Sequence, residues 1–573
     1  MPELRPVAAP GATGSPWREL FTPKLVTALR EGYSLATFRH DLIAGLTVAV
    51  VALPLAMALA IASGTTPDRG LFTAVIAGFL ISALGGSRLQ VGGPTGAFVV
   101  VVFAVIERHG YDGLVLATIM AGLMLILLGV LRLGTIIKYM PYPVITGFTS
   151  GIAVIIFTSQ ITEFLGLELA QVPADFVAKI AALAHALPSL DPATLAIGLG
   201  TLVLILALRR LRPQLPAFLI AVAAASLVVW ASGLEVATIG SRFGSIPRTL
   251  PAPALPEVSF ERIQALFPDA FTIALLAAIE SLLSAVIADG MAGTRHRSNC
   301  ELIAQGIANV ASPLFGGLPA TGAIARTATN IRAGARTPVA GMLHAFFLLV
   351  FMLLMAPLAN GFPLASLAAV LIVVAWTMSE AEHFLHLLRA PRGDVVILLL
   401  TFALTVFVDI TVAVEVGVVL AALLFMRRMA AATEIRTHAG LLQEDVADQP
   451  RAAGRRLTLA QDLPDGVAVY RINGPFFFGA SWRLKDALDR VGVAPRTFIL
   501  DLAQVPFIDA TGAHALGEFI RSSRRRGATV ILAGVARETR RALRAMDLVP
   551  RDRSVRFAPS LERALDIVRA AAG

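Results

Sequence analysis

Long apolar runs are the feature that most constrains this chain. Between residues 40 and 430, predominantly apolar stretches follow one another with short polar breaks, and a helix needs about 20 such residues to cross a bilayer. The composition agrees, because 56% of the 573 residues are hydrophobic and 15% are charged, against about 25% charged in a typical soluble protein. We therefore predict a polytopic α-helical membrane protein. The candidate spans are 41–62, 70–86, 112–131, 143–165, 193–208, 215–233, 268–290, 300–316, 338–357, 363–378, 394–408 and 410–426.

Two further apolar stretches, 95–107 and 321–332, are too short to be ordinary spans, and each follows a break rich in glycine and proline. Counting them gives fourteen membrane elements. The proline-rich segment 234–266 separates the first seven from the last seven and is predicted to be the main external loop. An odd number of elements in each half makes the two halves inverted relative to each other, as in many secondary transporters. The expected fold is therefore a 7+7 inverted repeat in which the third and tenth elements are half-helices.

Basic residues predict the orientation in the membrane. Lys and Arg accumulate in cytoplasmic loops. When the predicted spans are counted along the chain, the basic clusters all fall on the same side of the membrane. We expect both termini in the cytoplasm of a multi-pass protein of the cell's inner (plasma) membrane. The net charge of +9 is then explained without a nucleic-acid partner. The basic residues are Arg88, Arg132, Lys138, Arg209, Arg210, Arg212, Arg295, Arg297, Arg332, Arg336, Arg389, Arg392, Arg427 and Arg428.

The charges also predict the domains. Of the 87 charged residues, 38 lie in the last 140 residues, so we expect a cytoplasmic segment 1–39, a transmembrane transport domain 40–430 and a soluble domain 431–573. The first segment lacks the apolar core and cleavage site of a signal peptide. In the last, strands at 467–472, 497–502 and 529–534 alternate with helices at 480–491, 510–523 and 538–546. This alternation predicts a small α/β domain with a largely parallel sheet.

The two short elements begin with a similar motif. Gly92-Gly93-Pro94-Thr95-Gly96-Ala97-Phe98 and Gly316-Gly317-Leu318-Pro319-Ala320-Thr321-Gly322-Ala323-Ile324 both contain Gly-Gly, Pro and Thr-Gly-Ala. Proline and glycine interrupt a helix, so we expect an extended stretch that reaches the midplane, where a half-helix starts. Two facing helix N-termini offer unpaired N–H groups and partial positive charge, which predicts an anion site. The alternative is two irregular, tightly packed helices without a ligand. The predicted substrate-binding residues are Thr95, Gly96, Ala97, Phe98, Ala323, Ile324, Ala325 and Arg326.

Two charged side chains fall inside apolar spans near these motifs. Arg326 lies about one turn into the second half-helix, and intramembrane ionisable residues are functional candidates. Glu280 and Ser284 share one helix face because they are four residues apart. Glu280 could carry a proton or coordinate a cation, and Ser284 lies beside it. The alternatives are that Arg326 snorkels, or that it forms a structural ion pair with Glu280.

The remaining features favour simpler interpretations. Pro54, within Leu53-Pro54-Leu55, is read as a packing kink, and Asp409 and Glu415 as charges at helix boundaries. A single cysteine, Cys300, excludes a disulfide scaffold or a thiolate cluster. His383 and His386 are read as exposed polar residues at a helix end rather than as metal ligands. No nucleophile, metal cluster or nucleotide loop was found, so we predict no metal, no cofactor and no enzymatic activity.

Taken together, these motifs resemble the sulfate permease (SulP) family over essentially the whole chain. The resemblance rests on Gly92–Phe98, on Asn299-Cys300-Glu301-Leu302-Ile303-Ala304-Gln305-Gly306-Ile307-Ala308-Asn309 and on Gly316–Arg326 running on to Asn330. The tail resembles a STAS domain through Asp501-Leu502-Ala503-Gln504-Val505-Pro506-Phe507-Ile508-Asp509-Ala510-Thr511-Gly512.

The resemblance implies a core domain of elements 1–4 and 8–11, a gate domain of elements 5–7 and 12–14, elevator-type movement and a homodimer. It implies that a small inorganic anion binds between the starts of elements 3 and 10. The backbone donors would be those of Ala97, Phe98, Ala325 and Arg326, with Glu280 as the coupling position. It further implies that the STAS domain binds a cytoplasmic protein.

The chain departs from the family pattern at two places. Many members have Gln after the proline of the first element, where this chain has Leu55, and Val51–Gly64 is similar to the bicarbonate-transporting branch. That branch, however, has Asp in place of Glu280 and no Arg at position 326. We therefore expect proton-coupled transport of sulfate or a similar oxyanion. The alternatives are a sodium-coupled bicarbonate transporter, an anion channel or an exchanger of chloride or dicarboxylate; a nucleobase transporter is disfavoured by Arg326 and the STAS tail.

Thr511 carries one more prediction from the resemblance. The matching residue in soluble STAS proteins can be a phosphorylation site, which would make Thr511 regulatory. The alternative, which we favour, is that its hydroxyl caps the helix that begins here.

Overall fold

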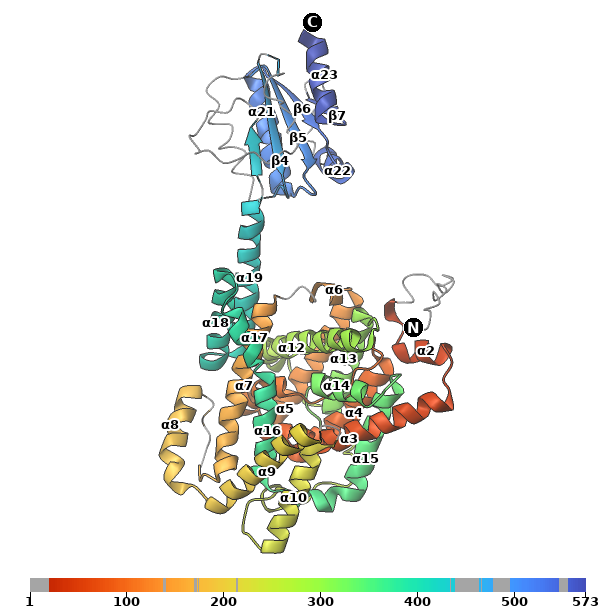
Figure 1. Cartoon of the computed structure of the whole chain (residues 1–573), viewed down its shortest axis with the longest axis vertical. Coiled ribbons are helices and arrows are strands. Elements are labelled where there is room, and N and C mark those ends of the chain that lie inside the picture. Colours follow the sequence, from red (N-terminus) through yellow and green to blue (C-terminus); the bar gives the residue numbers. More distant parts are fainter. Residues whose placement is uncertain are drawn as a thin grey trace. The chain divides into compact units, whose positions relative to one another are not determined.

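The computed structural model of the chain describes residues 20–137, 141–169, 173, 175–212, 215–432, 434–437, 463–464, 466–477, 495–545 and 555–572. The chain divides into two compact units, Met1–Val419 and Leu420–Gly573. In Figure 1 the first is a bundle of helices and the second a sheet with helices. Each unit is described by itself.

Helices lie at every apolar stretch predicted from the sequence. By length and composition, eight of the described helices can cross a membrane, which agrees with a multi-pass membrane protein. The helices at the predicted stretches are α3 (Leu35–Ala62), α4 (Pro67–Leu84), α5 (Gly96–Val130), α7 (Tyr142–Leu165), α9 (Pro192–Leu211), α10 (Ala217–Ser232), α12 (Phe260–Ala292), α13 (Ser298–Leu314), α14 (Ile324–Arg332), α15 (Val339–Ala359), α16 (Leu364–Met378), α18 (Arg392–Phe407) and α19 (Ile410–Ala432).

The predicted elements 95–107 and 112–131 are joined in α5. Gly110 has a φ of 67° and a ψ of 177° inside this helix, so the chain bends sharply there. Glycine occupies the left-handed region without the penalty that a Cβ would bring. The bend therefore separates α5 into the short and the long element that the sequence pattern predicted.

Several connections carry short helices that the sequence pattern did not predict. The longest, α8, follows α7, and the Asp175 side chain caps it by accepting a hydrogen bond from Ala178 N. The predicted external loop contains α11. The unpredicted helices are α2 (Lys24–Arg30), α6 (Gly134–Ile137), α8 (Phe176–Ala186), η1 (Leu187–Ser189), α11 (Ile239–Phe243) and α17 (Ala381–Leu387).

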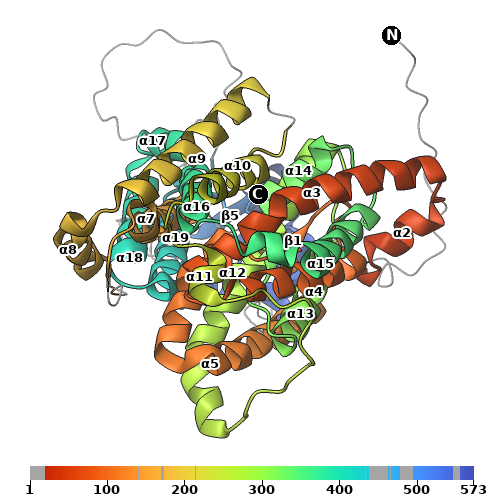
Figure 2. The same ribbon diagram turned by 90° about the horizontal axis from the view of Figure 1, so that it is seen from below.

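The helices of the first unit pack in two groups. In one group, α5 packs against α12 and α13, and α3 packs against α4 and α15. In the other, α7 packs against α16 and α18, and α9 packs against α10 and α16. Figure 2 shows the two groups side by side. At the α5–α13 crossing, a Cβ on Gly122 would lie 2.7 Å from the Gly306 carbonyl oxygen. Small residues let membrane helices approach closely in this way.

The second unit is a five-stranded sheet in the order β3-β4-β5-β6-β7. Among the strands of this sheet that the structure describes, β3 and β4 are antiparallel and the other neighbours are parallel. Side chains from α21 and α22 pack with Tyr470 and Leu500 on one face, and side chains from α23 pack with Val469 and Ile499 on the other. The elements are β3 (Glu434–Thr437), β4 (Val467–Asn473), β5 (Thr497–Gln504), α21 (Ala510–Arg525), β6 (Thr529–Ala533), α22 (Arg537–Ala545), β7 (Val555–Ala558) and α23 (Leu561–Ala572).

This arrangement confirms the predicted α/β domain with a largely parallel sheet. The predicted strands correspond to β4, β5 and β6, and the predicted helices 510–523 and 538–546 correspond to α21 and α22. The predicted helix 480–491 lies outside the described residues. β3, β7 and α23 were not predicted.

Candidate functional site

The two glycine- and proline-rich breaks meet as a pair of short strands. β1 (Gly92–Gly93) runs antiparallel to β2 (Thr321–Gly322), with Gly92 opposite Gly322 and Gly93 opposite Thr321. α5 begins three residues after β1, and α14 begins two residues after β2. The structure therefore brings together two helix starts that are more than 200 residues apart in the sequence. The first N–H groups of a helix have no partner within the helix, so the anion site predicted at these two helix starts stays a prediction.

The two breaks are not equivalent residue by residue. Thr95 is the N-cap of α5, although its side chain makes no capping hydrogen bond. The corresponding N-cap of α14 is Ala323, whereas Thr321 lies within β2. The two Thr-Gly-Ala sequences are therefore offset by two residues relative to the helices that follow them. A match of sequence alone could not reveal this offset, because it is set by the pairing of the two strands.

Glu280 on α12 contacts the first break. The Thr95 hydroxyl donates a hydrogen bond of 2.9 Å to Glu280 Oε2, across 185 residues of sequence. Both side chains are half-buried, so they border accessible space. Glu280 therefore lies beside the start of α5, as predicted, and its carboxylate contacts the N-cap residue of that helix.

Arg326 is buried beside the first break and does not share the accessible space at Thr95 and Glu280. Its side chain is 1% exposed, and Nη2 donates to the Pro94 carbonyl oxygen at 3.2 Å. Nε and Nη1 are buried without a hydrogen-bond partner. Arg326 forms no salt bridge with Glu280, both residues being described, so the alternative of a structural ion pair between them is wrong. Snorkelling is also excluded, because the guanidinium is buried beside the first break. A buried guanidinium with two unused donors requires a negative or polar partner.

Three hydroxyl groups, none of them among the predicted substrate-binding residues, hold the second break in place. Ser281 Oγ and Thr321 Oγ1 lie 2.6 Å apart, and Ser281 Oγ accepts from Gly322 N at 3.1 Å. Thr327 Oγ1 accepts from Val91 N at 3.1 Å. The only sequence signal was the position of Ser281 next to Glu280.

Ser284 belongs to this buried network as well. Its hydroxyl lies 3.3 Å from Thr327 Oγ1 and its side chain is fully buried. Although Ser284 is one helical turn from Glu280, it contacts α14 whereas Glu280 contacts the start of α5. The predicted pair is therefore divided between the two breaks.

Buried carboxylates and amides hold the loops around the breaks. Glu301 is fully buried and accepts from Gly86 N at 2.9 Å and Ser87 N at 3.0 Å. Asn309 bonds both the N–H and the carbonyl oxygen of Ala320 at 2.8 Å. These contacts give a structural account of the polar residues in the stretch 299–309, because unpaired buried N–H groups would be costly.

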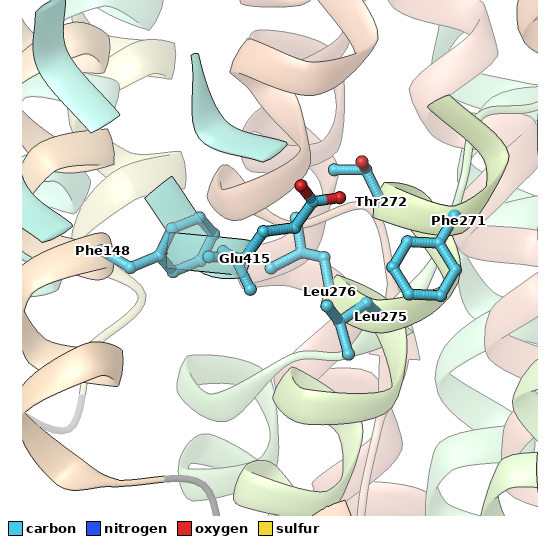
Figure 3. Close-up of a pocket in the computed structure, with 7 residues that line it drawn as sticks. Phe148, Phe271, Thr272, Leu275, Leu276 and Glu415 are labelled. Atoms are coloured by element: carbon cyan, nitrogen blue, oxygen red, sulfur yellow. The ribbon is translucent and has the colours of Figure 1, made fainter. Parts of the chain in front are cut away.

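A small pocket lies one helical turn from Glu280 on α12. It has a volume of about 10 Å³, room for about one water molecule. Figure 3 shows Glu415 of α19 directed toward Thr272, with Phe148 and Leu276 alongside. Glu415 thus lies inside α19, which begins at Ile410, and reading it as a boundary charge was wrong.

The remaining sequence predictions concern the proline of the first span, the cap of the helix at Thr511 and metal ligands. Leu55 is buried in a helix, α3, that continues through Pro54. In the second unit, Asp509 caps α21 by accepting from Gly512 N at 2.7 Å. Capping by Thr511 was therefore wrong, and Thr511 is exposed in the first turn. No group of three or more His, Cys, Asp or Glu that could hold a metal ion occurs within the described part of the chain.

Comparison with known proteins places this arrangement in a family. Residues 38–401 match the Sulfate permease family and residues 460–564 match the STAS domain. The protein named "Putative sulfate transporter YvdB" from Bacillus subtilis is 43% identical over 90% of this chain and 94% of its own length. Bicarbonate transporter BicA from Picosynechococcus is 32% identical over 90% of this chain and 91% of its own length.

A solved structure supports the same fold. The murine Solute Carrier 26 family member A9 anion transporter in its inward-facing state superposes with a TM-score of 0.84 at 18% identity, covering 99% of this chain and 96% of that one. Since its identity is low, it supports the fold alone. With a family match over more than half of the residues and full-length relatives above 30% identity, this chain belongs to the sulfate permease family and carries a C-terminal STAS domain.

Proposed function

We propose that this chain is a secondary active transporter of a small inorganic anion, with sulfate or a similar compact oxyanion as substrate and protons as the coupling ion. The observation that carries the proposal is the 2.9 Å hydrogen bond from Thr95 to Glu280 at the start of α5. It places an ionisable carboxylate within reach of a helix N-terminus that attracts anions. Anion binding and protonation of Glu280 therefore favour each other.

A charge count supports proton coupling for sulfate. Each helix N-terminus contributes about half a positive charge, and Arg326 contributes one. Together they balance the two negative charges of sulfate when Glu280 is protonated. When Glu280 is ionised, one negative charge remains in excess in a site of low dielectric. Sulfate should therefore be carried with a proton on Glu280.

Bicarbonate is the second candidate, because a bicarbonate transporter is among the relatives. The same positive charges balance one bicarbonate together with an ionised Glu280. Bicarbonate would thus bind without a proton on Glu280, and the pH dependence of uptake separates the two substrates.

The anion-binding groups in this proposal are backbone N–H groups. Those of Gly96, Ala97 and Phe98 lie in the first turn of α5, and those of Ile324 and Ala325 in the first turn of α14. The Phe98 N–H also donates to the Thr95 carbonyl oxygen at 3.3 Å, which leaves Gly96 and Ala97 as the open donors of α5. Thr95, Ile324 and Ala325 are partly accessible and line the approach, and Arg326 neutralises the anion from behind. Ala323, predicted to bind substrate, donates its N–H to the Val91 carbonyl oxygen at 2.9 Å, so in this proposal it holds the start of α14 in place together with Ser284.

The two packing groups support an elevator mechanism. α3, α4, α5 and α12–α15 would form a core that carries the site, and α7, α9, α10, α16, α18 and α19 a gate against which it moves. In this proposal the elements form a 7+7 inverted repeat, the protein is a homodimer in the plasma membrane and both termini are cytoplasmic. Alternating access around a fixed site is the general principle of such repeats.

The STAS domain is proposed to bind a cytoplasmic protein, with Thr511 as a regulatory phosphorylation site. Thr511 is exposed within the first turn of α21, where a phosphate would meet the helix N-terminus. Incubation with kinase-containing lysate followed by mass spectrometry tests this assignment, and an unmodified Thr511 under conditions that phosphorylate other sites would contradict it.

The experiment that tests transport uses the full chain in proteoliposomes. Radiolabelled sulfate uptake is followed with and without an inward proton gradient, with labelled bicarbonate and a sodium gradient as parallel arms. Uptake that rises with the proton gradient supports the proposal, and gradient-independent uptake contradicts the coupling. Unitary currents in planar bilayers would indicate a channel instead.

A further inference from the structure

A second cavity lies within the first unit, away from the paired helix starts. Its volume is about 310 Å³, and it is bounded by α5, α7, α8, α12 and the turn between α18 and α19. One wall is a stripe of α5 that runs from Val100 and Val101 through Ala104 to Arg108. Because α5 starts at Gly96, the cavity begins about one turn beyond the proposed anion site. It continues to the end of the bundle at which α8 lies, which the proposed topology makes the external side.

Most of the charged groups around this cavity have partners of their own. Arg108 Nη2 donates to Asp269 Oδ1 at 2.8 Å, and His109 Nε2 lies 3.5 Å from Asp269 Oδ2. Asp175 accepts from Ala178 N at 2.8 Å and caps α8. Asp409, which has an interaction of its own, completes the acidic groups on the wall.

Lys179 is different. It lines the cavity from α8, yet its side chain is only 5% exposed. Its ammonium lies 5.7 Å from the centre of the Phe103 ring, and it makes no hydrogen bond or ion pair with the part of the chain that the structure describes. A ring face replaces little of the hydration that a buried ammonium has lost. Burial lowers the pKa of Lys179, and the carboxylates of Glu107 and Asp175 act in the opposite direction.

We propose that this cavity is a second anion site, in which Lys179 holds the transported anion transiently on its way between the external solution and the starts of α5 and α14. The inference rests on the proposed function, because it takes the same anion as substrate. The volume accommodates an oxyanion with several of its waters, and the ammonium supplies the direct charge. The nearby carboxylates keep the site weak, and an entry site must release its ion as readily as it binds it.

The first test compares uptake from the two sides of the membrane. In intact cells expressing the full chain, Lys179→Gln should raise the external KM for sulfate about fivefold, the effect of one partly solvated ion pair, with Vmax retained. In everted vesicles, where sulfate enters from the cytoplasmic face, the KM should be unchanged. Lys179→Arg should keep the wild-type KM, and Arg209→Gln, at an exposed helix end, is the matched control.

An unchanged external KM in Lys179→Gln, or an equal change from both sides, would overturn the second site. If the wild-type chain takes up neither sulfate nor another small anion, the proposed function fails. Anion binding at Lys179 is then tested by the labelling measurement described next.

The second test begins with a labelling measurement that needs no transport. Cys300, the single cysteine, is buried, so Lys179→Cys in a Cys300→Ala background offers one thiol. We expect sulfate to slow its labelling by a negatively charged methanethiosulfonate, measured as a mass shift. Aminoethylation, which rebuilds a positive side chain, should restore the external KM. Labelling that sulfate does not slow, or a KM that aminoethylation leaves raised, would contradict the proposal.

Discussion

The two breaks carry similar sequences but different chemistry. At the first, the Thr95 hydroxyl reaches out to Glu280 in a half-buried position. At the second, Thr321 is fully buried, bonded to Ser281 and to the Ala277 carbonyl oxygen. A repeated motif therefore builds two helix starts alike while only one of them presents a carboxylate partner. We therefore assign coupling to the first break, at Thr95, and anchoring of the helix start to the second, at Thr321. Four predictions test this assignment, in order of decreasing effect.

The largest effect is expected at Glu280. Glu280→Gln removes the group that would gain and lose a proton, so sulfate accumulation driven by a proton gradient should be abolished. Sulfate binding should remain, since glutamine is neutral like the protonated acid. Proteoliposome uptake and a binding assay measure the two quantities. Glu261→Gln, in the first turn of the same helix, is the control, and proton-driven accumulation that persists in Glu280→Gln would end its assigned role.

Arg326 comes next, because it joins the two breaks through Pro94. Arg326→Gln should lower sulfate affinity about 30-fold or more, the usual loss when one partner of a buried charge contact is removed. Arg332→Gln, at the end of the same helix, should bind as the wild type does. Equal affinities for Arg326→Gln and Arg332→Gln in equilibrium binding of labelled sulfate would show that the guanidinium is structural.

The strand glycines distinguish the breaks through what a methyl group would meet. A Cβ on Gly93 would collide with Arg326 Nη1, and a Cβ on Gly322 with Gln90 Nε2. Gly93→Ala should therefore displace the guanidinium and weaken sulfate binding by about tenfold. Gly322→Ala should displace Gln90 from the Ser281 carbonyl oxygen and lower thermal stability. The division of roles is wrong if both variants show the same pattern in binding and melting measurements.

The smallest effects are expected for the two threonines. Thr321→Ala leaves buried hydrogen-bonding groups unpaired and should lower the free energy of unfolding by about 1–3 kcal/mol. Thr95→Ala removes one half-buried contact to Glu280 and should leave melting unchanged while shifting the pH dependence of uptake. Thermal melts and uptake measured against pH provide the data. A stability loss in Thr95→Ala without a pH shift would reverse the assignment.

Much of the architecture was predictable from the sequence because it follows from local rules. Apolar runs predicted the helices, and the Gly-Pro breaks predicted interrupted elements, because proline and glycine act on their own neighbours. The strand and helix alternation predicted the STAS sheet in the same way. The unpredicted α8 and β3 are short, and short elements give weak periodic signals.

Except for the position of Glu415 in α19, the predictions and alternatives that failed concerned side-chain partners. Arg326 pairs with the Pro94 carbonyl oxygen rather than with Glu280, and Ser284 bonds α14 rather than joining Glu280. Asp509, not Thr511, caps α21. The N-cap is the residue with non-helical backbone at the start of the helix. A sequence motif does not reveal whether that residue is Asp509 or lies two positions later, at Thr511.

By itself the sequence determined that this chain spans a membrane many times, that two of its elements begin with matched breaks, and that two ionisable residues lie among apolar ones. These properties depend on hydrophobicity, chain stiffness and charge, which each residue carries with it. Only the tertiary structure decided that Glu280 meets Thr95, that Arg326 is buried behind Pro94, and that Lys179 lines a cavity without a salt bridge to any residue the structure describes. Such contacts join residues up to 232 positions apart, and they are set by how helices pack rather than by their local sequence.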